Sequence, residues 1–208
     1  MAKVLVIRLS AIGDVAMTVP VIYSAAKANP EDSFTVLTQA FLMPLFMNRP
    51  PNVEVIGINT KGAEKGLIGL LKFISALLKF DFDVILDLHN VIRTIIICTF
   101  FRLNGKRVFV LDKARKERKR LTAIKGKRLY PLRPVIVRYA DVFRAAGLNY
   151  TETFTSLYEE FPAELSGMAS VAGIKKGKWI GVAPFAKHRA NMVSAQIQNK
   201  ADKVNFPE

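Results

Sequence analysis

The chain has 208 residues, of which 50% are hydrophobic and 23% charged, a composition that suits a globular protein with a full core. Its two longest apolar stretches, residues 66–80 and 94–101, are interrupted by lysine or shorter than the roughly 18 to 20 apolar residues that a membrane-spanning helix needs. The one cysteine, Cys98, excludes a disulfide framework and is expected to be a buried small hydrophobe. With no signal-peptide pattern after Met1, these features predict a cytoplasmic protein.

The net charge of +14 is concentrated in one segment. Residues 102–144 contain fifteen Lys and Arg but only three acidic residues, a net charge of +12. Such a segment attracts anionic partners, whether nucleic acid, acidic lipid headgroups or an acidic sugar. The alternative is a solvated face that only aids solubility.

Short apolar, β-branched runs alternate with helical patterns along the chain. Taken in order, the predicted strands are residues 3–9, 33–38, 53–58, 83–88, 107–111 and 179–183. The predicted helices are residues 14–28, 40–48, 64–80, 91–103, 134–146 and 162–172. The helix at 64–80 is interpreted as packed in the core, with a bilayer-contacting helix as the alternative. The alternation predicts an α/β fold with a Rossmann-like, doubly wound parallel sheet.

The pattern changes after residue 172, which divides the chain into two parts. Residues 1–172 are expected to form one Rossmann-like domain. The glycine- and lysine-rich residues 173–178 are typical of a linker, and residues 179–184 resemble the first strand of a second α/β unit. Residues 173–208 are therefore interpreted as a linker with the truncated start of a second domain, and their tail is expected to be poorly ordered.

The first strand is followed by the dipeptide Gly13-Asp14. Gly13 permits a tight or positive-φ turn, and Asp14 is placed at a helix N-terminus, either as an N-cap or as a general base at the carboxyl edge of the sheet. Because Gly13 is the only glycine in this junction, the three-glycine dinucleotide fingerprint is absent, and no nicotinamide cofactor is predicted.

A second polar group follows the predicted strand at 83–88. Asp87, His89, Asn90 and Arg93 are expected at the same edge as Asp14, where they could bind sugar hydroxyls, carboxylates or phosphates. Equally, Asp87 and Asn90 could cap the next helix. A single histidine in this position is weak evidence for a metal, and none is predicted.

Four blocks, in this order, resemble the lipopolysaccharide heptosyltransferases of glycosyltransferase family 9. The resemblance covers roughly residues 1–189 and departs from the family near residue 190. The blocks read VLVIRLSAIGD at 4–14 with TVP at 18–20, FDVILDLHNVIRT at 82–94, RYADVF at 138–143, and GVAPFAKH at 181–188.

The resemblance implies a GT-B enzyme whose N-terminal domain holds the acceptor and whose C-terminal domain holds ADP-heptose. It implies inverting, metal-independent transfer of heptose to the lipopolysaccharide inner core, with Asp14 as the base. Donor phosphates would meet Lys187 and Arg189. The acceptor-binding candidates are Ser10, Gly13, His89, Asn90, Arg93, Arg115, Arg118 and Arg120.

Family members are nearly twice as long, so the chain is expected to be a truncated copy that does not turn over substrate alone. The basic runs at residues 113–121 and 125–128 suit the anionic Kdo region of lipid A at the inner face of the inner membrane. The alternative function is a basic module that binds a membrane surface or anionic ligand without catalysis. Nucleic acid is disfavoured, because these two runs contain no aromatic residue on which bases could stack, and Tyr130 is the first aromatic residue after them.

Overall fold

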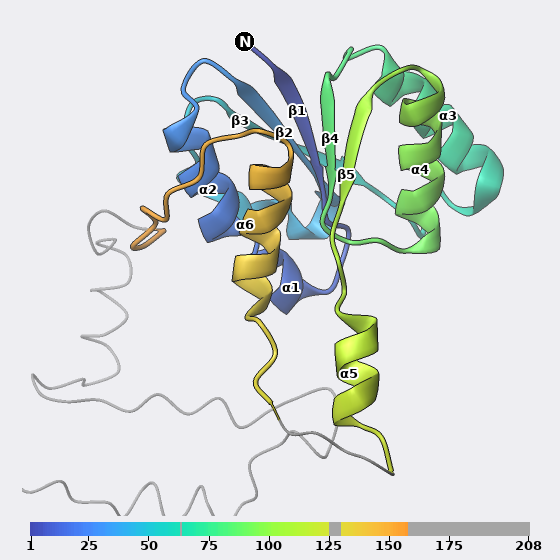
Figure 1. The fold of residues 1–208 in the computed structure, drawn as a ribbon. Helices are drawn as coiled ribbons and strands as arrows, with labels where there is room; N and C mark the ends of the chain where they lie inside the picture. The colour runs from blue at the N-terminus through green and yellow to red at the C-terminus, as the bar shows by residue number, and fades with distance from the viewer. Residues whose placement is uncertain (63, 125–129, 158–208) are drawn as a thin grey trace, which may run out of the picture. The chain divides into compact units, whose positions relative to one another are not determined.

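A computed structural model describes residues 1–62, 64–124 and 130–157, which form an α/β unit around a five-stranded parallel sheet (Figure 1). The sheet has the strand order β3-β2-β1-β4-β5, so β1 lies at its centre. The predicted parallel, doubly wound architecture is confirmed. The strands are β1 (Lys3–Ile7), β2 (Ser33–Gln39), β3 (Val53–Ile58), β4 (Val84–Asp87) and β5 (Arg107–Val110).

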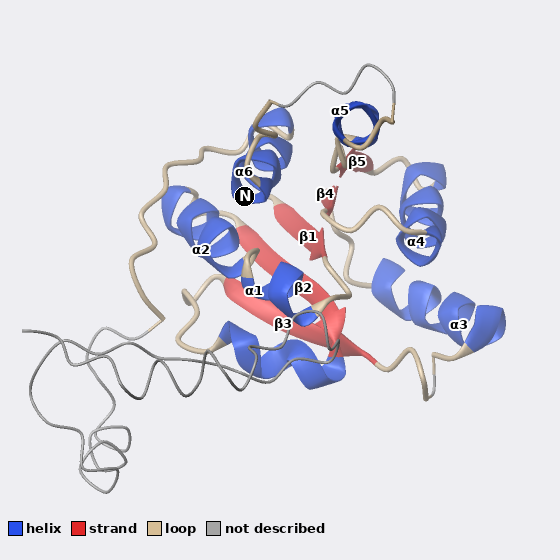
Figure 2. Ribbon diagram, turned by 90° about the horizontal axis from the view of Figure 1, so that it is seen from below, coloured by secondary structure: helices blue, strands red, loops and turns tan. Residues whose placement is uncertain are grey.

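Helices cover both faces of the sheet (Figure 2). Because side chains alternate between the two faces of a strand, each strand contributes residues to two cores. Val4 and Val6 of β1 pack in one core cluster with residues of α2 and α6, and Leu5 and Ile7 pack in another with residues of α3 and α4 (Figure 2). The segment α5 extends beyond the carboxyl edge of the sheet. The helices are α1 (Ile12–Ala16), α2 (Val19–Ala28), the 3-10 helix η1 (Ala40–Phe46), α3 (Gly66–Leu78), α4 (Ile92–Leu103), α5 (Arg115–Leu121) and α6 (Val135–Ala145).

Three helical segments differ from the sequence prediction. The single helix predicted over residues 14–28 is two helices, because Pro20 lacks the N–H that would continue the ladder through this point. The helix predicted over 40–48 is the 3-10 helix η1, which contains Pro44. Helix α5 was not predicted, because its sequence RKERKRL has no apolar period to indicate a helix.

Burial of the central strands and of Cys98 agrees with the sequence analysis. All four residues of β4 are buried, as a parallel strand between two helical layers requires. Cys98 is buried, and this burial, followed by the charge of Asp87, raises the pKa of its thiol to about 12. None of the helices within the described ranges is long and apolar enough to cross a membrane.

Several predictions fall on residues outside the described ranges. These are the helix at 162–172, the linker at 173–178, the strand at 179–183, the tail, and the two donor-phosphate candidates Lys187 and Arg189. The predicted domain boundary after residue 172 lies there as well.

Candidate functional site at the carboxyl edge of the sheet

The topology opens a crevice where β1 and β4 end. These strands are parallel neighbours, with Ile7 opposite Asp87 in the register. The chain leaves β1 toward the α2 and α6 layer and leaves β4 toward the α4 layer, so the two connections diverge at this edge. A pocket of about 520 Å³ lies here, which we call the Asp14 pocket. The polar residues that line it are Arg8, Ser10, Asp14, His89, Lys113, Arg118, Arg138 and Tyr139.

Arg8 fixes the position of Asp14. The Arg8 side chain is 8% exposed, whereas that of Asp14 is 42% exposed. Arg8 Nη1 donates to the Leu88 carbonyl at 2.6 Å, its Nη2 forms an ion pair with Asp14 Oδ2, and its guanidinium carbon lies 5.9 Å from the centroid of the Tyr139 ring. With both ends of the guanidinium held, the Asp14 carboxylate is oriented at the pocket while one side of it remains open to a ligand.

Of the two alternatives for Asp14, the N-cap does not hold. The N-cap of α1 is Ala11, and Asp14 lies in the first turn, where its charge still complements the helix dipole. The turn role of Gly13 is also wrong: Gly13 is helical, and its φ is not in the left-handed region. A Cβ at Gly13 would meet no atom within 4 Å. Neither the backbone conformation nor packing among the described residues therefore requires glycine here.

Asp87 organises the connection after β4 from inside the protein. Its Oδ1 accepts the backbone N–H groups of His89 at 2.9 Å and Asn90 at 2.8 Å, and its Oδ2 accepts the Thr94 hydroxyl at 2.8 Å. The alternative that Asp87 and Asn90 cap the next helix does not hold, because the N-cap of α4 is Val91 and the Thr94 hydroxyl accepts the Val91 N–H. Asp87 is 1% exposed, so it shapes the site without reaching the pocket.

The loop held by Asp87 presents His89 to the pocket. His89 Nε2 lies 3.4 Å from the Ser10 hydroxyl, so this contact bridges the connections after β4 and β1. Burial, followed by the positive charge of Arg8, lowers the pKa of His89 from 6.5 to about 4. His89 is therefore a neutral hydrogen-bonding group at neutral pH.

The lowered pKa of His89 gives a pH-dependent contribution to stability. Above pH 6.5 the ring is neutral in both states, but between pH 6.5 and about 4 the unfolded chain binds a proton that the folded chain does not. This contribution is thus lost as the pH falls through that window. We expect His89→Gln to flatten the dependence of the unfolding free energy on pH between 6.5 and 4, measured by urea denaturation. An unchanged slope would contradict the assignment.

Three further cations reach the pocket: Lys113 from the connection between β5 and α5, Arg118 from α5 and Arg138 from α6. With Arg8 they face Asp14, the single carboxylate among the residues that line this pocket. Burial, followed by the charge of Arg115, lowers the pKa of Lys113. This crowding of like charges would be relieved by an anion.

The other sequence candidates are divided among several places. Asn90 and Arg115 line a neighbouring pocket of about 460 Å³, which shares Lys113 with the Asp14 pocket. Asn90 Nδ2 donates to the Leu111 carbonyl at 3.1 Å. Arg93 is turned toward the α3 side and donates to the Glu64 carbonyl at 3.0 Å, so it does not join Asp14. Arg120 is exposed on α5 and lines neither pocket.

The Asp14 pocket also gathers buried polar atoms that have no partner. In the described part of the chain, five buried side-chain nitrogen or oxygen atoms lack a hydrogen-bond partner, and four belong to residues of this pocket. They are Arg8 Nε, His89 Nδ1, Arg138 Nε and the Tyr139 hydroxyl. Buried polar groups are nearly always paired, so their concentration here indicates a ligand-binding site.

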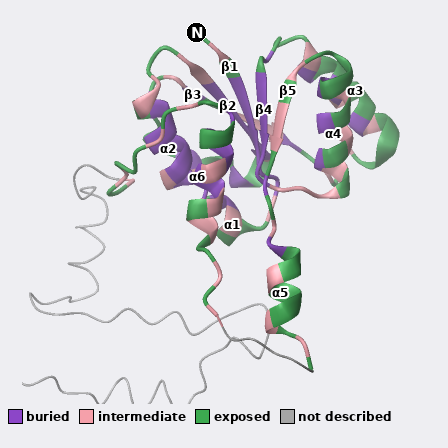
Figure 3. Cartoon of the chain, viewed as in Figure 1, coloured by how far each residue is buried: buried purple, intermediate pink, exposed green. Residues whose placement is uncertain are grey.

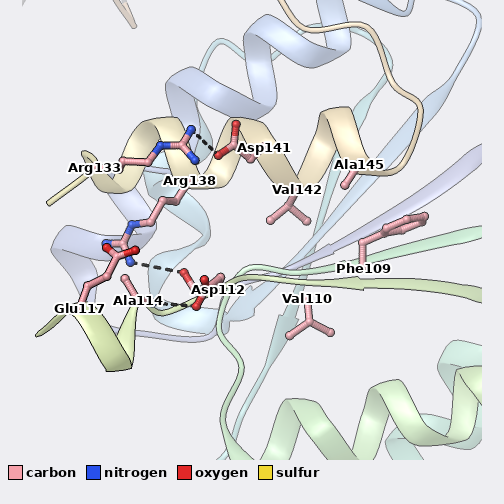
Figure 4. Close-up of a pocket in the computed structure, with 10 residues that line it drawn as sticks. All are labelled: Phe109, Val110, Asp112, Ala114, Glu117, Arg133, Arg138, Asp141, Val142 and Ala145. Carbon is pink, nitrogen blue, oxygen red and sulfur yellow. Dashed lines mark hydrogen bonds and ion pairs between the residues drawn. The ribbon is translucent and has the colours of Figure 1, made fainter. Parts of the chain in front are cut away.

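A smaller pocket of about 280 Å³ on the other side of Arg138 has a different character (Figure 4). It contains the carboxylates of Asp112, Glu117 and Asp141. Arg133 pairs with Asp141 at 2.7 Å, and Arg138 Nη1 donates to the Asp112 carbonyl at 3.3 Å. The Arg138 contact ties α6 to the residues before α5. The three carboxylates make this pocket a poor anion site compared with the Asp14 pocket.

The fold is shared with known glycosyltransferase structures, although no protein-family model and no curated protein matches the chain. It superposes on the glycosyl transferase family 9 protein of Veillonella parvula DSM 2008 with a TM-score of 0.58 and 20% identity, over 84% of this chain and 51% of that one. For ADP-heptose lps heptosyltransferase II of E. coli the TM-score is 0.51, with 21% identity and coverages of 84% and 51%. For E. coli heptosyltransferase WaaC with ADP the values are 0.50, 22%, 74% and 49%.

These structures confirm the predicted resemblance at the level of the fold. The chain has the fold of about half of a family 9 glycosyltransferase, and it spans about half the length of the structures that it matches. The Rossmann-like sheet predicted as the first half of a GT-B enzyme is therefore present.

Four polar residues of the Asp14 pocket were not among the sequence candidates: Arg8, Lys113, Arg138 and Tyr139. One signal could have identified Arg8, because it is a charged residue between the apolar neighbours Ile7 and Leu9 at the end of a buried strand. Tyr139 and Arg138 lie on α6, far along the chain, and no local pattern indicated that this helix would close the pocket.

Proposed function

We propose that this chain is the acceptor-binding half of an inverting glycosyltransferase that transfers heptose from ADP-heptose to the anionic inner core of lipopolysaccharide. The observation that carries the proposal is Asp14, a carboxylate oriented by the buried Arg8 in a pocket that is otherwise cationic. The fold shared with family 9 glycosyltransferases supports it.

In this reaction Asp14 would accept the proton of the attacking sugar hydroxyl. The hydroxyl oxygen would form a bond to the anomeric carbon of the donor as the bond from that carbon to the diphosphate breaks, so ADP leaves with the electron pair and the configuration inverts. No metal is needed in this scheme. The residues that would neutralise the departing diphosphate include Lys187 and Arg189, and stabilisation of ADP requires the donor half of the enzyme. We therefore expect no release of ADP from ADP-heptose by the 208-residue chain alone.

The acceptor would bind through its acidic groups. Lys113, Arg118 and Arg138 provide charge for carboxylates or phosphates of a Kdo-bearing lipid A, and His89, Tyr139 and Ser10 provide neutral groups for sugar hydroxyls. Because such an acceptor is anchored in a membrane, the protein would work in the cytoplasm at the inner face of the inner membrane. The second candidate, a basic module that binds anionic ligands without catalysis, shares the cationic pocket but gives no role to Asp14.

Acceptor binding can be tested apart from any membrane with a deacylated, soluble Kdo-bearing acceptor. We expect Lys113→Glu combined with Arg118→Glu to weaken binding about tenfold or more, measured by calorimetric titration. Lys27→Glu, an exposed charge change on α2, is the control and should leave binding unchanged. Equal affinity for inorganic phosphate and for the sugar acceptor would favour the second candidate.

Gly13→Ala separates stability from binding. Because an added Cβ would meet nothing within 4 Å and alanine favours helix, we expect the unfolding free energy to stay the same or rise by up to about 1 kcal/mol. Because Gly13 is one of the acceptor-binding candidates that the resemblance implies, an added methyl group is expected to weaken binding of the soluble acceptor. A variant that is more stable and binds equally well would show that Gly13 does not contact the ligand.

A further inference from the structure

The outer side of α3 is apolar although it is exposed. Leu70, Ile74 and Leu77 bury the inner side of this helix against the sheet. Facing away from the core, Leu67 and Ile68 are 59% and 74% exposed. The prediction of a packed helix therefore holds for only one side, because a solvent-facing side would normally be polar.

Helix α4 repeats this arrangement. Thr94, Ile97, Cys98 and Phe101 face the core, whereas Ile92 and Leu103 are 80% and 78% exposed and Ile95 is also exposed. Helices α3 and α4 lie in the same layer and contribute to the same core cluster, and Figure 3 shows exposed residues along both. We call the six large apolar residues that these helices expose the α3–α4 face: Leu67, Ile68, Leu71, Ile92, Ile95 and Leu103.

The charges on these two helices are all positive. Neither helix contains an acidic residue, and their basic residues are Lys72, Arg93 and Arg102, with Lys65 and Lys79 next to the ends of α3. Of the acidic residues that flank α3, Asp81 is paired with Lys106 at 2.6 Å and Glu64 accepts the backbone N–H of Asn59 at 2.8 Å. Large exposed apolar side chains on helices that carry only positive charge are typical of protein surfaces that lie in the interface of an anionic bilayer.

We propose that the α3–α4 face docks on the surface of a membrane that contains anionic lipids. A second copy of the chain is a poor occupant, because a symmetric contact would bring the same cations together. Residues 158–208 are no better complement, since they contain seven Lys and Arg against five acidic residues. The proposal rests on the proposed function only in that a lipid-linked acceptor would bring the chain to a membrane.

The position of the face suits access to the Asp14 pocket. Ile92 begins α4 only three residues after His89, which lines the pocket. Parallel strands place the N-termini of α3 and α4 at the carboxyl edge of the sheet, the edge that carries Asp14 (Figure 1). A bilayer that covers the α3–α4 face would therefore meet the protein beside the acceptor pocket.

The buried thiol of Cys98, with its pKa raised to about 12, allows single-site labelling. We would prepare Ile68→Cys and Ile95→Cys, attach an environment-sensitive fluorophore, and add vesicles of phosphatidylglycerol and phosphatidylcholine that contain no lipopolysaccharide. Val137→Cys, an exposed position of α6 in the opposite layer, is the matched control. We expect a blue shift and quenching by brominated lipid at positions 68 and 95, with neither at 137.

Three results would overturn the proposal. Vesicle binding without a spectral change at positions 68 and 95 would assign the contact to another surface, such as α5. A blue-shifted emission before vesicles are added would show that the face is already covered. A shift independent of protein concentration would assign the cover to the rest of the chain, and a shift that increases with concentration would assign it to a second copy. Failure here together with intact binding of the soluble acceptor would reject the membrane face while leaving the proposed function in place.

Loss of the apolar contacts gives a second measurement. We expect Ile68→Ser combined with Ile95→Ser to weaken vesicle binding about tenfold or more. Each change replaces apolar side-chain area that the bilayer would bury by a hydroxyl. Val137→Ser is expected to change it less than about twofold. Both proteins should keep the urea midpoint of the original chain, since all three positions are exposed. Equal vesicle binding by both variants would contradict the proposal.

Discussion

Replacing Arg8 by methionine is expected to lower the free energy of unfolding by about 2 kcal/mol and to abolish binding of the soluble acceptor. Methionine fills much of the same volume, but the Leu88 carbonyl then loses the donor that lies 2.6 Å away. Asp14 loses the cation that orients it, although its 42% exposure lets water hydrate the charge and limits the cost. Urea denaturation and calorimetric titration of the same preparation measure the two effects.

The matched control for this variant is Arg107→Met. Arg107 is exposed at the start of β5, at the opposite end of the sheet, so its replacement should change stability by less than about 0.5 kcal/mol and leave binding unaltered. If Arg8→Met were destabilised but bound the acceptor as tightly as the original chain, Arg8 would have a structural role only. The orientation of Asp14 by Arg8 would then not matter for recognition.

Replacing Asp87 by alanine is expected to lower the unfolding free energy by about 3 to 4 kcal/mol, the largest effect of any single change proposed for this chain. The N–H groups of His89 and Asn90 and the hydroxyl of Thr94 would lose an acceptor that is itself 1% exposed. The loop that presents His89 would lose its shape as well, so acceptor binding should fall together with stability. Urea denaturation measures the first effect.

Asp87→Asn is the informative companion. Its carbonyl oxygen can still accept the N–H groups of His89 and Asn90, and its amide can donate toward Thr94, so a loss of only about 1 kcal/mol is expected. Equal destabilisation by alanine and asparagine would mean that the negative charge of Asp87, and not its hydrogen bonds, holds the loop.

Most of the sheet could be predicted from sequence because buried parallel strands have a strong local signal. The strand at 53–58 was predicted at its observed bounds, and the other four described strands differ by one or two residues at their ends. The errors lie where a proline interrupts an apolar pattern that otherwise predicts a continuous α-helix. Pro20 divides a long helical pattern into two helices, and Pro44 accompanies a 3-10 helix in place of an α-helix.

The site was less predictable because its parts are joined only by the fold. Asp14 and His89 follow strands, so the topology rule placed them at one edge, and the structure brings both to the same pocket. Arg93 obeyed the same rule but turns toward Glu64, since the rotation of a helix decides which residues face a pocket. Tyr139 and Arg138 come from α6, whose amphipathic pattern indicates an inner face without naming its neighbour.

The central position of β1 also determines when the pocket can form during folding. Strand β1 pairs with β2, about thirty residues further along, but Arg8 is anchored by the Leu88 carbonyl, eighty residues away. As the chain emerges from the ribosome, the first three strands can associate before β4 has been synthesised, since near contacts close their loops at lower entropic cost. The ion pair between Arg8 and Asp14 acquires its fixed orientation only when β4 joins, so a ligand of this pocket would bind only chains whose sheet is complete.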